Sequence, residues 1–223
     1  MLQPSTLNYI KKLAKTNNKQ WFDANRNQFE DAKNDFEKLV EKIIQTFGKI
    51  DPDIAPLKAK DCSFRQYRDV RFSKDKTPYK VHMGASFDRG GKKSGFAGYY
   101  LHLEPGNKSM IGGGLWMPEA PALKKVRQEI DYCYDEFSKI INDPAFKKFY
   151  GDLEKGEYSL SREPKGYEKE NPAIEYLKLK SFVAIRSVAD EEVVSENYFK
   201  EIIAGFTALM PLIKFINRAL EVV

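Results

Sequence analysis

The sequence predicts an α+β fold in which helices at both ends of the chain flank an antiparallel sheet. Two patterns support this fold class. Near both termini, apolar residues recur at three- and four-residue steps, the spacing of a helix that buries one face. In the middle of the chain, apolar and polar residues alternate, as in strands with one solvated face. The 223 residues contain no internal repeat and no low-complexity linker, so we expect a single α+β domain over residues 1–223.

Two helices are predicted before residue 50. Ser5 is a candidate N-cap for the first helix, which is expected to end at Asn17. The second helix is expected from about residue 19 to residue 47, and Gly48 is expected to end it. Six apolar residues form one stripe along this second helix: Phe22, Phe29, Phe36, Leu39, Ile43 and Phe47. We expect this stripe to pack on the core.

Alternation of apolar and polar residues predicts the strands. Residues 81–87 and 99–103 alternate on either side of a glycine-rich turn, which indicates an antiparallel hairpin. A third strand is expected at about 109–116 and a fourth at about 181–188. The glycines at 112–114 have no side chains, so this stretch either cradles an anion or fits a crowded strand.

Helical spacing returns in the second half of the chain. Residues 118–141 carry apolar side chains at three- and four-residue steps, and Asp143 is expected to start a short helix that ends at Tyr150. Residues 151–173 are expected to form a long polar loop. The C-terminal segment is again helical in pattern, and Pro211 is expected to mark a kink or a boundary in it.

The composition limits the classes of partner. The net charge is +5, from 37 basic and 32 acidic residues, whereas a dedicated nucleic-acid-binding protein usually has a larger excess or a basic tail. The two cysteines, Cys62 and Cys133, are far apart and favour a reduced chain. No targeting signal or membrane-spanning stretch is present, so we expect a cytoplasmic protein without a membrane partner. The sequence carries no signal for an oligomeric state.

The most informative segment is residues 64–82, which interleaves cations with aromatic residues. Guanidinium groups offer paired donors that fit a carboxylate or a phosphate, and lysines add point charges. The candidate ligand-binding cations are Arg65, Arg68, Arg71, Lys74, Lys76 and Lys80. An alternative is an internal network in which Asp69 and Asp75 hold Arg68 and Arg71 and the segment only braces the fold.

The predicted hairpin brings the two histidines of the chain to one face. Aligning the hydrophobic sides of its strands places His82 opposite His102 and Lys80 opposite Glu104, with Tyr100 on the same side. His82, His102 and Glu104 are therefore candidate catalytic proton carriers, and Tyr100 is a candidate ligand-binding residue. The alternative is an ordinary solvated sheet face.

No established catalytic motif accompanies these residues. The chain has no Ser-His-Asp order, no P-loop and no dinucleotide-binding fingerprint. Two histidines and Glu104 could also hold a metal ion, but their spacing matches no known metal motif. The sequence therefore predicts no metal site and assigns no cofactor.

Three functional hypotheses remain. The first is a domain that binds a small phosphate- or carboxylate-bearing ligand through the Arg/Lys cluster, either with or without catalysis; it predicts a pocket that joins the arginines to the histidines. The second is a non-catalytic module that binds nucleic acid or protein through an open basic stripe. In the third, the cluster only stabilises the fold.

Four segments also carry a family resemblance, and the second of them, YRDVRFSKDKTPYK, is distinctive. In order along the chain the segments are residues 18–26, 67–80, 98–106 and 164–167. Together they resemble a widespread bacterial and fungal family known as domain of unknown function 2461. The resemblance implies a single α+β domain and brings no activity, substrate or cofactor. One departure is Asn171-Pro172, where the family pattern often has His-Pro; a catalytic role of that histidine in other members would be absent here.

Overall fold

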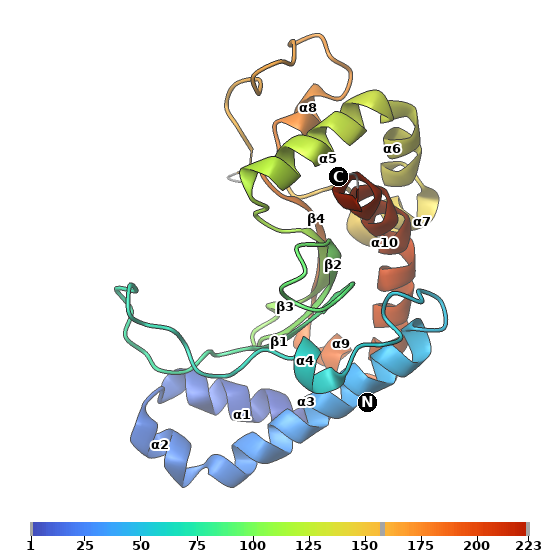
Figure 1. Cartoon of the computed structure of the whole chain (residues 1–223). Coiled ribbons are helices and arrows are strands. Elements are labelled where there is room, and N and C mark those ends of the chain that lie inside the picture. The colour runs from blue at the N-terminus through green and yellow to red at the C-terminus, as the bar shows by residue number, and fades with distance from the viewer. Residues whose placement is uncertain (1, 157–158, 222–223) are drawn as a thin grey trace. The chain divides into compact units, whose positions relative to one another are not determined.

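The computed structural model describes residues 2–156 and 159–221 and contains helices and one four-stranded antiparallel sheet (Figure 1). This confirms the predicted α+β fold. The strands follow one another in the sheet in the order β1-β2-β3-β4. Their bounds are Met83–Asp88 for β1, Gly98–Leu103 for β2, Ser109–Leu115 for β3 and Phe182–Val188 for β4. All four lie within two residues of the predicted positions, because alternation is a direct consequence of strand geometry.

The packing of the chain divides it into two compact units, which are described separately. Unit 1 takes in the described residues of Met1–Phe87, Tyr100–Ile111 and Ser187–Ile203. Unit 2 takes in those of Asp88–Tyr99, Gly112–Arg186 and Ala204–Val223. Each strand contributes residues to both units. A single domain over residues 1–223 stays a prediction.

The helices of unit 1 correct two predictions at their ends. Helix α1 begins at Pro4 with Gln3 as its N-cap, so the Ser5 cap was wrong; proline is favoured in a first turn because its missing N–H would be unpaired there. The helix predicted over residues 19–47 is divided at Asn25, whose backbone is not helical and whose amide donates to the Trp21 carbonyl at 2.9 Å. The bounds in unit 1 are α1 Pro4–Lys15, α2 Lys19–Ala24, α3 Arg26–Phe47, α4 Ala59–Cys62 and α9 Asp190–Val193.

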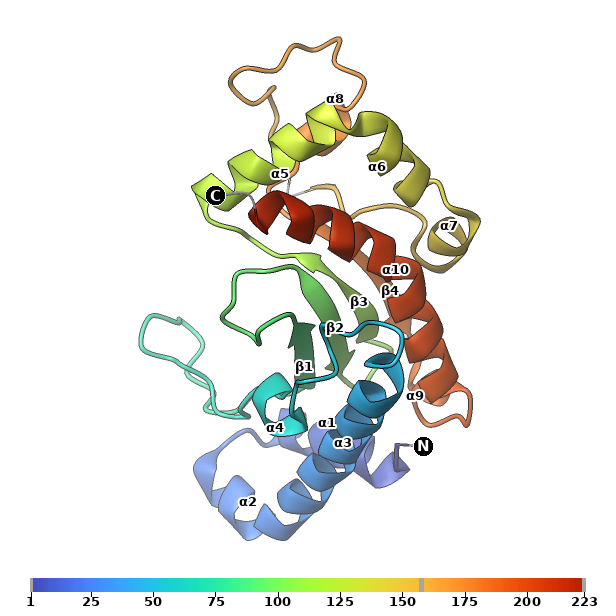
Figure 2. The ribbon, with the colours of Figure 1, turned by 45° about the vertical axis from the view of Figure 1, so that its right-hand side comes forward.

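The core of unit 1 lies between α1, α3 and the sheet residues of the unit. Helices α1 and α3 lie side by side in both ribbon views (Figures 1 and 2). Of the predicted stripe, all members except the half-buried Phe29 are buried. Gly48 ends α3 as predicted, and a Cβ there would lie 2.6 Å from the Ile44 carbonyl and 2.8 Å from Ala55 Cα. Close backbone approach is therefore the physical reason for this glycine.

Unit 2 contains most of the remaining helices. Their bounds are α5 Ala120–Tyr132, α6 Tyr134–Ile141, α7 Pro144–Tyr150, α8 Ile174–Leu177 and α10 Tyr198–Glu221, of which Ala204–Glu221 belongs to unit 2. The helix predicted over 118–141 is divided at Cys133. Asp143 caps α7 as predicted, accepting from the Ala145 N–H at 2.8 Å. Helix α10 continues through Pro211, so this proline does not mark a boundary.

Aromatic and ionic contacts tie α10 to its neighbours within unit 2. Phe215 lies 5.6 Å from Phe137 of α6, measured between ring centroids. Arg218 forms ion pairs with Glu129 of α5 at 2.6 Å and with Glu136 of α6 at 2.8 Å. None of the described helices is both long enough and apolar enough to cross a lipid bilayer.

The three glycines of β3 fit a crowded strand. A Cβ at Gly112 would lie 2.4 Å from the Ala184 carbonyl, and one at Gly114 would lie 2.0 Å from the Phe182 carbonyl. At Gly113 the Gly98 carbonyl would be 2.3 Å away. Backbone of the two flanking strands therefore occupies the space that side chains would need, which favours the packing interpretation over an anion cradle.

Candidate functional site

The basic segment begins as an irregular extra strand on the outer edge of β1. Isolated bridges join Ser63 to Ala85 and Tyr67 to Tyr79, both antiparallel. Between the two bridges the register shifts by two residues, because 63 and 85 sum to 148 whereas 67 and 79 sum to 146. The Gln66 amide donates to the carbonyls of Lys80 and His82 within this irregular stretch. This irregularity explains why β1 begins at residue 83 and not at the predicted residue 81.

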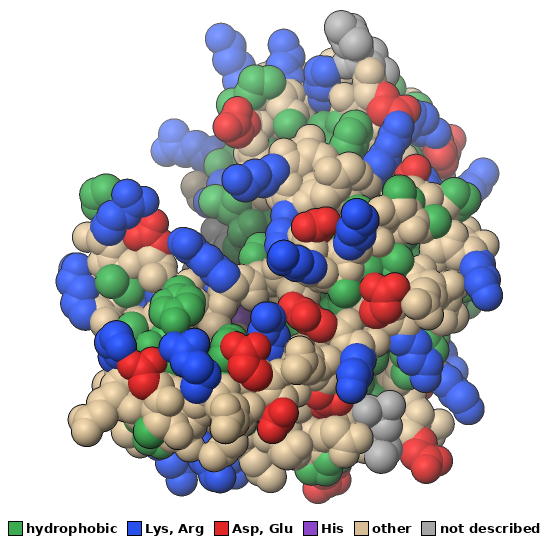
Figure 3. Space-filling model, turned by 60° about the horizontal axis from the view of Figure 1, so that its bottom comes forward, with side chains coloured by type: hydrophobic (Ala, Val, Ile, Leu, Met, Phe, Trp, Pro, Cys, Tyr) green, Lys and Arg blue, Asp and Glu red, His purple; other side chains and the backbone are tan. Residues whose placement is uncertain are grey.

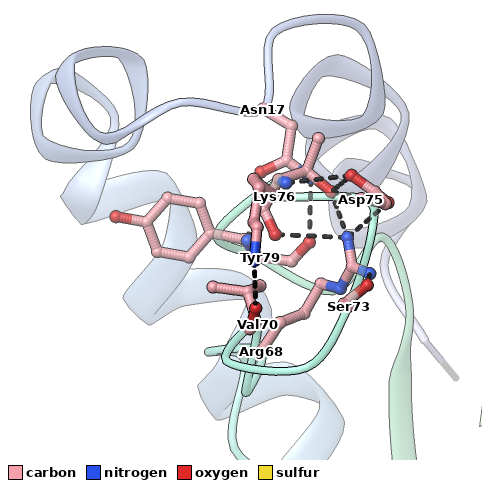
Figure 4. Close-up of polar contacts among 8 residues, drawn as sticks. Asn17, Arg68, Val70, Ser73, Asp75, Lys76 and Tyr79 are labelled. Carbon is pink, nitrogen blue, oxygen red and sulfur yellow. Dashed lines mark hydrogen bonds and ion pairs between the residues drawn. The ribbon is translucent and has the colours of Figure 1, made fainter.

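Asn17 and Phe22 hold the far end of this pairing against the N-terminal helices. The Asn17 amide donates to the Tyr79 carbonyl at 2.8 Å, and the Tyr79 N–H donates back to Asn17 Oδ1 at 3.2 Å. The Tyr79 ring stacks on the Phe22 ring, with centroids 4.0 Å apart. Figure 4 shows Asn17 beside Tyr79. Tyr79 thus packs the end of the basic segment against the N-terminal helices.

Arg68 is held by the loop that follows it (Figure 4). Its guanidinium donates to Asp75 Oδ2 at 2.5 Å, to the Thr77 carbonyl at 3.2 Å and to the Thr77 hydroxyl. The Thr77 N–H, followed by Arg68, lowers the pKa of Asp75 to about 2. The Arg68 side chain is three-quarters buried by these contacts. It therefore serves the internal network that the sequence offered as an alternative.

The other cations of the loop divide into paired and unpaired groups. Arg71 donates to Asp69 at 3.0 and 2.7 Å, and Lys76 donates to the Val70 carbonyl at 2.9 Å. Arg65 and Lys74 are exposed and form no hydrogen bond or ion pair within the described part of the chain. Phe72, at the tip, is 96% exposed.

The polar face of the hairpin brings the other predicted site residues together. The Tyr100 hydroxyl lies 3.0 Å from His102 Nδ1, and His102 Nε2 lies 3.0 Å from Glu104 Oε2. The His82 and His102 ring centroids are 4.5 Å apart, as expected for residues opposite each other. His102 is buried, whereas His82 is half-buried and a small histidine surface is visible in Figure 3. Tyr100, His102 and Glu104 thus form a continuous polar chain beside His82.

Burial dominates the electrostatics of this face. Burial first, and then the neighbouring His102 and Lys80, lower the pKa of His82 to about 4 against the opposing effect of Glu104. His82 is therefore a neutral imidazole at pH 7. Burial, followed by the Glu104 carboxylate, also raises the pKa of Tyr100, so its hydroxyl keeps its proton.

Gly84 and Phe64 determine where the Tyr100 hydroxyl lies. A Cβ at Gly84 would be 2.9 Å from the Tyr100 hydroxyl oxygen, so glycine leaves the space that this group occupies. The Phe64 ring meets Tyr100 edge-on with centroids 6.3 Å apart, and the Lys80 ammonium lies over Phe64 at 5.2 Å. Lys80 therefore lies near Tyr100 and His82, at the end of the basic segment that leads into β1.

The structure brings one part of the predicted site together through direct contacts. Tyr100, His102 and Glu104 assemble with His82, and Lys80 lies beside them. Within the described residues, none of the five other predicted cations forms a hydrogen bond or ion pair with these groups: Arg65, Arg68, Arg71, Lys74 and Lys76. The predicted joint pocket of arginines and histidines stays a prediction.

Sequence reasoning missed two residues of the site. Lys108 Nζ lies 3.6 Å from Glu104 Oε1, and its position in the tight turn after Glu104 was an available signal. Gln66, which is buried and satisfies backbone carbonyls of the irregular edge, left no signal in the sequence. Its role arises from the register shift, which depends on pairing between segments that are far apart in the chain.

The His82, His102 and Glu104 side chains have the geometry of a possible metal centre. One ligand atom from each residue can be chosen so that the three atoms lie within 4.8 Å of one another. Glu104 turns Oε2 toward both histidines, at 3.0 Å from His102 Nε2 and 4.0 Å from His82 Nδ1. The sequence predicted no metal here, because neither residue spacing nor motif reveals a cluster formed between strands.

Asn171, where the family pattern often has histidine, has a structural role in unit 2. Its amide donates to Asp131 Oδ1 of α5 at 2.6 Å. Its side-chain oxygen accepts from the Ala173 N–H at 2.8 Å, just before α8. Asn171 therefore joins the 159–173 loop to α5 and closes the turn that leads into α8.

Comparison with known proteins gives one match. The model of a family described as "Conserved hypothetical protein (DUF2461)" matches residues 5–215 of the 223. No curated protein and no solved structure matched the chain. The family match spans both units and nearly the whole sequence. The chain therefore belongs to the conserved hypothetical protein family DUF2461.

Proposed function

We propose that this protein binds a small phosphate- or carboxylate-bearing ligand beside His82 and that the His102–Glu104 pair transfers a proton to or from it. The observation that carries the proposal is the polar chain from Tyr100 through the buried His102 to Glu104, with hydrogen-bonding distances of 3.0 Å at both ring nitrogens. A histidine oriented by a carboxylate is a recurring general acid–base arrangement.

The charges around the pair favour an anionic ligand. Lys80 and Lys108 contribute two positive charges near this face, against the single negative charge of Glu104. His82 is half-buried and neutral at pH 7, so it can donate a hydrogen bond to a ligand oxygen without a charge of its own. Arg68 is committed to Asp75 and Thr77, and we assign it no contact with the ligand.

A thermal-shift panel of phosphates, nucleotides and small carboxylates tests the proposal. A ligand that binds the folded protein raises Tm in a concentration-dependent way. We expect one class of anion to do so, and we expect Lys80→Gln to abolish that rise. Lys74→Gln is the matched control, because Lys74 lies in the exposed loop. The absence of any stabilising anion, or equal sensitivity to the two lysine variants, would contradict the proposed site.

A second candidate function is supported by residues 71–74, the tip of the basic segment. Phe72 is 96% exposed, and Arg71 and Lys74 lie beside it in the sequence and are exposed as well. An aromatic side chain among cations is typical of surfaces that stack on bases and hold phosphates. A gel-shift titration at low salt with single-stranded and double-stranded nucleic acid tests this function. We expect Phe72→Ser to weaken any binding that uses the tip, with the exposed Tyr132→Ser as its control.

A further inference from the structure

We propose that His82, His102 and Glu104 together bind one divalent transition-metal ion. The proposal concerns the site of the proposed function and goes beyond it, because His102 Nε2 and Glu104 Oε2 would bind the ion and the proton transfer proposed for this pair would then belong to the metal-free protein. It rests on a separate observation, the convergence of three metal-ligating side chains. An ion would also change the charge at this face. Glu104 repels an anion, and the arginines that the sequence assigned to an anion are not bonded to the histidines. A divalent cation would neutralise Glu104 and add to the positive charge of Lys80 and Lys108.

The distances of the three ligand atoms suit one shared ion after a small movement. Glu104 Oε2 lies 3.0 Å from His102 Nε2 and 4.0 Å from His82 Nδ1, and all three ligand atoms fall within 4.8 Å. Metal–ligand bonds of about 2.0–2.2 Å would place ligand atoms roughly 3.3–3.6 Å apart in tetrahedral coordination. A separation of 4.8 Å would therefore have to close by about 1.2–1.5 Å.

His82 is the ligand that can make this movement. Its side chain is 30% exposed, and its ring nitrogens form no hydrogen bond with any residue in the described ranges. His82 also precedes β1 at the place where the edge pairing is irregular. His102 and Glu104, in contrast, are held by β2 and by the turn that follows it. Two fixed ligands and one adjustable ligand are suited to capture of an ion.

The neighbours of the ligands match the groups that hydrogen-bond to the ligands in known metal sites. A histidine that binds a metal through Nε2 carries its proton on Nδ1 and donates it to an oxygen. The Tyr100 hydroxyl lies 3.0 Å from His102 Nδ1, and a hydroxyl can accept this proton as readily as it can donate its own. Lys108 lies 3.6 Å from Glu104 Oε1, the carboxylate oxygen that faces away from His102. Tyr100 therefore orients His102, and Lys108 contacts the Glu104 carboxylate.

The ligand set indicates the class of metal. Two imidazole nitrogens and one carboxylate suit Zn²⁺ and neighbouring first-row ions, whereas Mg²⁺ and Ca²⁺ prefer sites made of oxygen atoms. Three protein ligands leave at least one coordination position for water or for a ligand oxygen. A phosphate or carboxylate could occupy this position directly, which links the metal to the proposed function.

Calorimetric titration of the tag-free, chelator-treated protein with Zn²⁺ alone tests the inference. We expect one Zn²⁺ per chain with micromolar or tighter affinity, and no binding of Mg²⁺. His82→Gln and Glu104→Gln should each weaken Zn²⁺ binding by more than 100-fold, since each removes a direct ligand. Tyr100→Phe should weaken it by about 10–100-fold, the range for residues that hydrogen-bond to a metal ligand. Equal affinities in the wild type and in these three variants would overturn the site.

Two further variants separate this site from other sources of binding. Glu119→Gln removes an exposed carboxylate outside the site and should leave the affinity unchanged. Cys133→Ser tests whether a free thiol captures the ion; loss of Zn²⁺ binding in this variant alone would overturn the proposal. Circular dichroism of each variant shows whether it is folded, and retained binding by folded His82→Gln counts against the site.

The Zn²⁺ titration and the anion panel together distinguish failure of the metal site from failure of the proposed anion binding. One equivalent of Zn²⁺ bound without any stabilising anion would support the metal site and contradict the proposed function. Anion binding by chelator-treated protein that ignores added Zn²⁺, together with no heat of Zn²⁺ binding, would do the reverse.

Discussion

At the scale of single residues, Tyr100 is the group on which the polar face depends. Its hydroxyl is 3.0 Å from His102 Nδ1, and it occupies the space that any side chain at residue 84 would fill. Sequence alternation correctly placed Tyr100, His102 and Glu104 on one side of the hairpin. It could not reveal that the hydroxyl lies against Gly84, because that contact depends on the three-dimensional position of the end of a long side chain.

A double-mutant cycle tests the contact between Gly84 and Tyr100. The new methyl group of Gly84→Ala would lie 2.9 Å from the Tyr100 hydroxyl and displace it, so we expect a loss of about 1 kcal/mol in the free energy of unfolding. The loss should shrink in the Tyr100→Phe background, where the hydroxyl is absent. Chemical denaturation of the four proteins measures the coupling, and additive effects would show that the contact is not responsible.

At the scale of elements, the basic segment (residues 64–82) is stabilised mainly by contacts of its own side chains. Arg68 crosses the loop to Asp75 and Thr77, and Asn17 fixes the Tyr79 backbone at its end. The sequence offered this internal network as an alternative because two carboxylates interrupt the cations. The sequence did not show which acid pairs with which arginine, because the pairing depends on the path of the backbone. Arg68 bonds Asp75, which is more distant in the sequence, while Arg71 bonds Asp69.

Matched substitutions at two arginines measure this stabilisation. Arg68→Gln should lower Tm by about 2–4 °C, because it removes several hydrogen bonds from a mostly buried guanidinium whose net value is about 1 kcal/mol. Arg71→Gln should change Tm little, because the Arg71 side chain is 76% exposed and solvent screens its pair with Asp69. Scanning calorimetry of both variants decides; an equal fall in Tm would show that the burial of Arg68 has no energetic consequence.

At the scale of the whole molecule, the charge of the chain is nearly balanced, and the titration of His82 contributes to how stability depends on pH. The pKa of His82 is about 4 in the folded state, below the ordinary value of 6.5. Between these values the unfolded chain binds a proton that the folded chain excludes. The contribution of His82 to the free energy of unfolding is therefore fully present above pH 6.5 and is lost as the pH falls toward 4.

The free energy of unfolding as a function of pH checks this statement in chelator-treated protein. We expect the wild type to lose stability between pH 6.5 and 4 with a slope that is greater by up to about one proton than that of His82→Gln. Asp75, whose pKa is about 2, contributes its loss at lower pH and does not obscure this window. Parallel pH profiles of the two proteins would contradict the assigned pKa of His82.

The sequence by itself determined the fold class, the approximate strand positions and the sharing of one face by His82, His102 and Glu104. These follow from side-chain periodicity, which is a local property of helices and strands. Only the tertiary structure decided the other features. It showed that helices are interrupted at Asn25 and Cys133 and that Gln66 bonds backbone at the register shift. It also showed that Arg68 pairs with Asp75 and that ligand atoms of His82, His102 and Glu104 lie within 4.8 Å of one another. Each of these depends on where separate segments meet, and no local pattern contains that information.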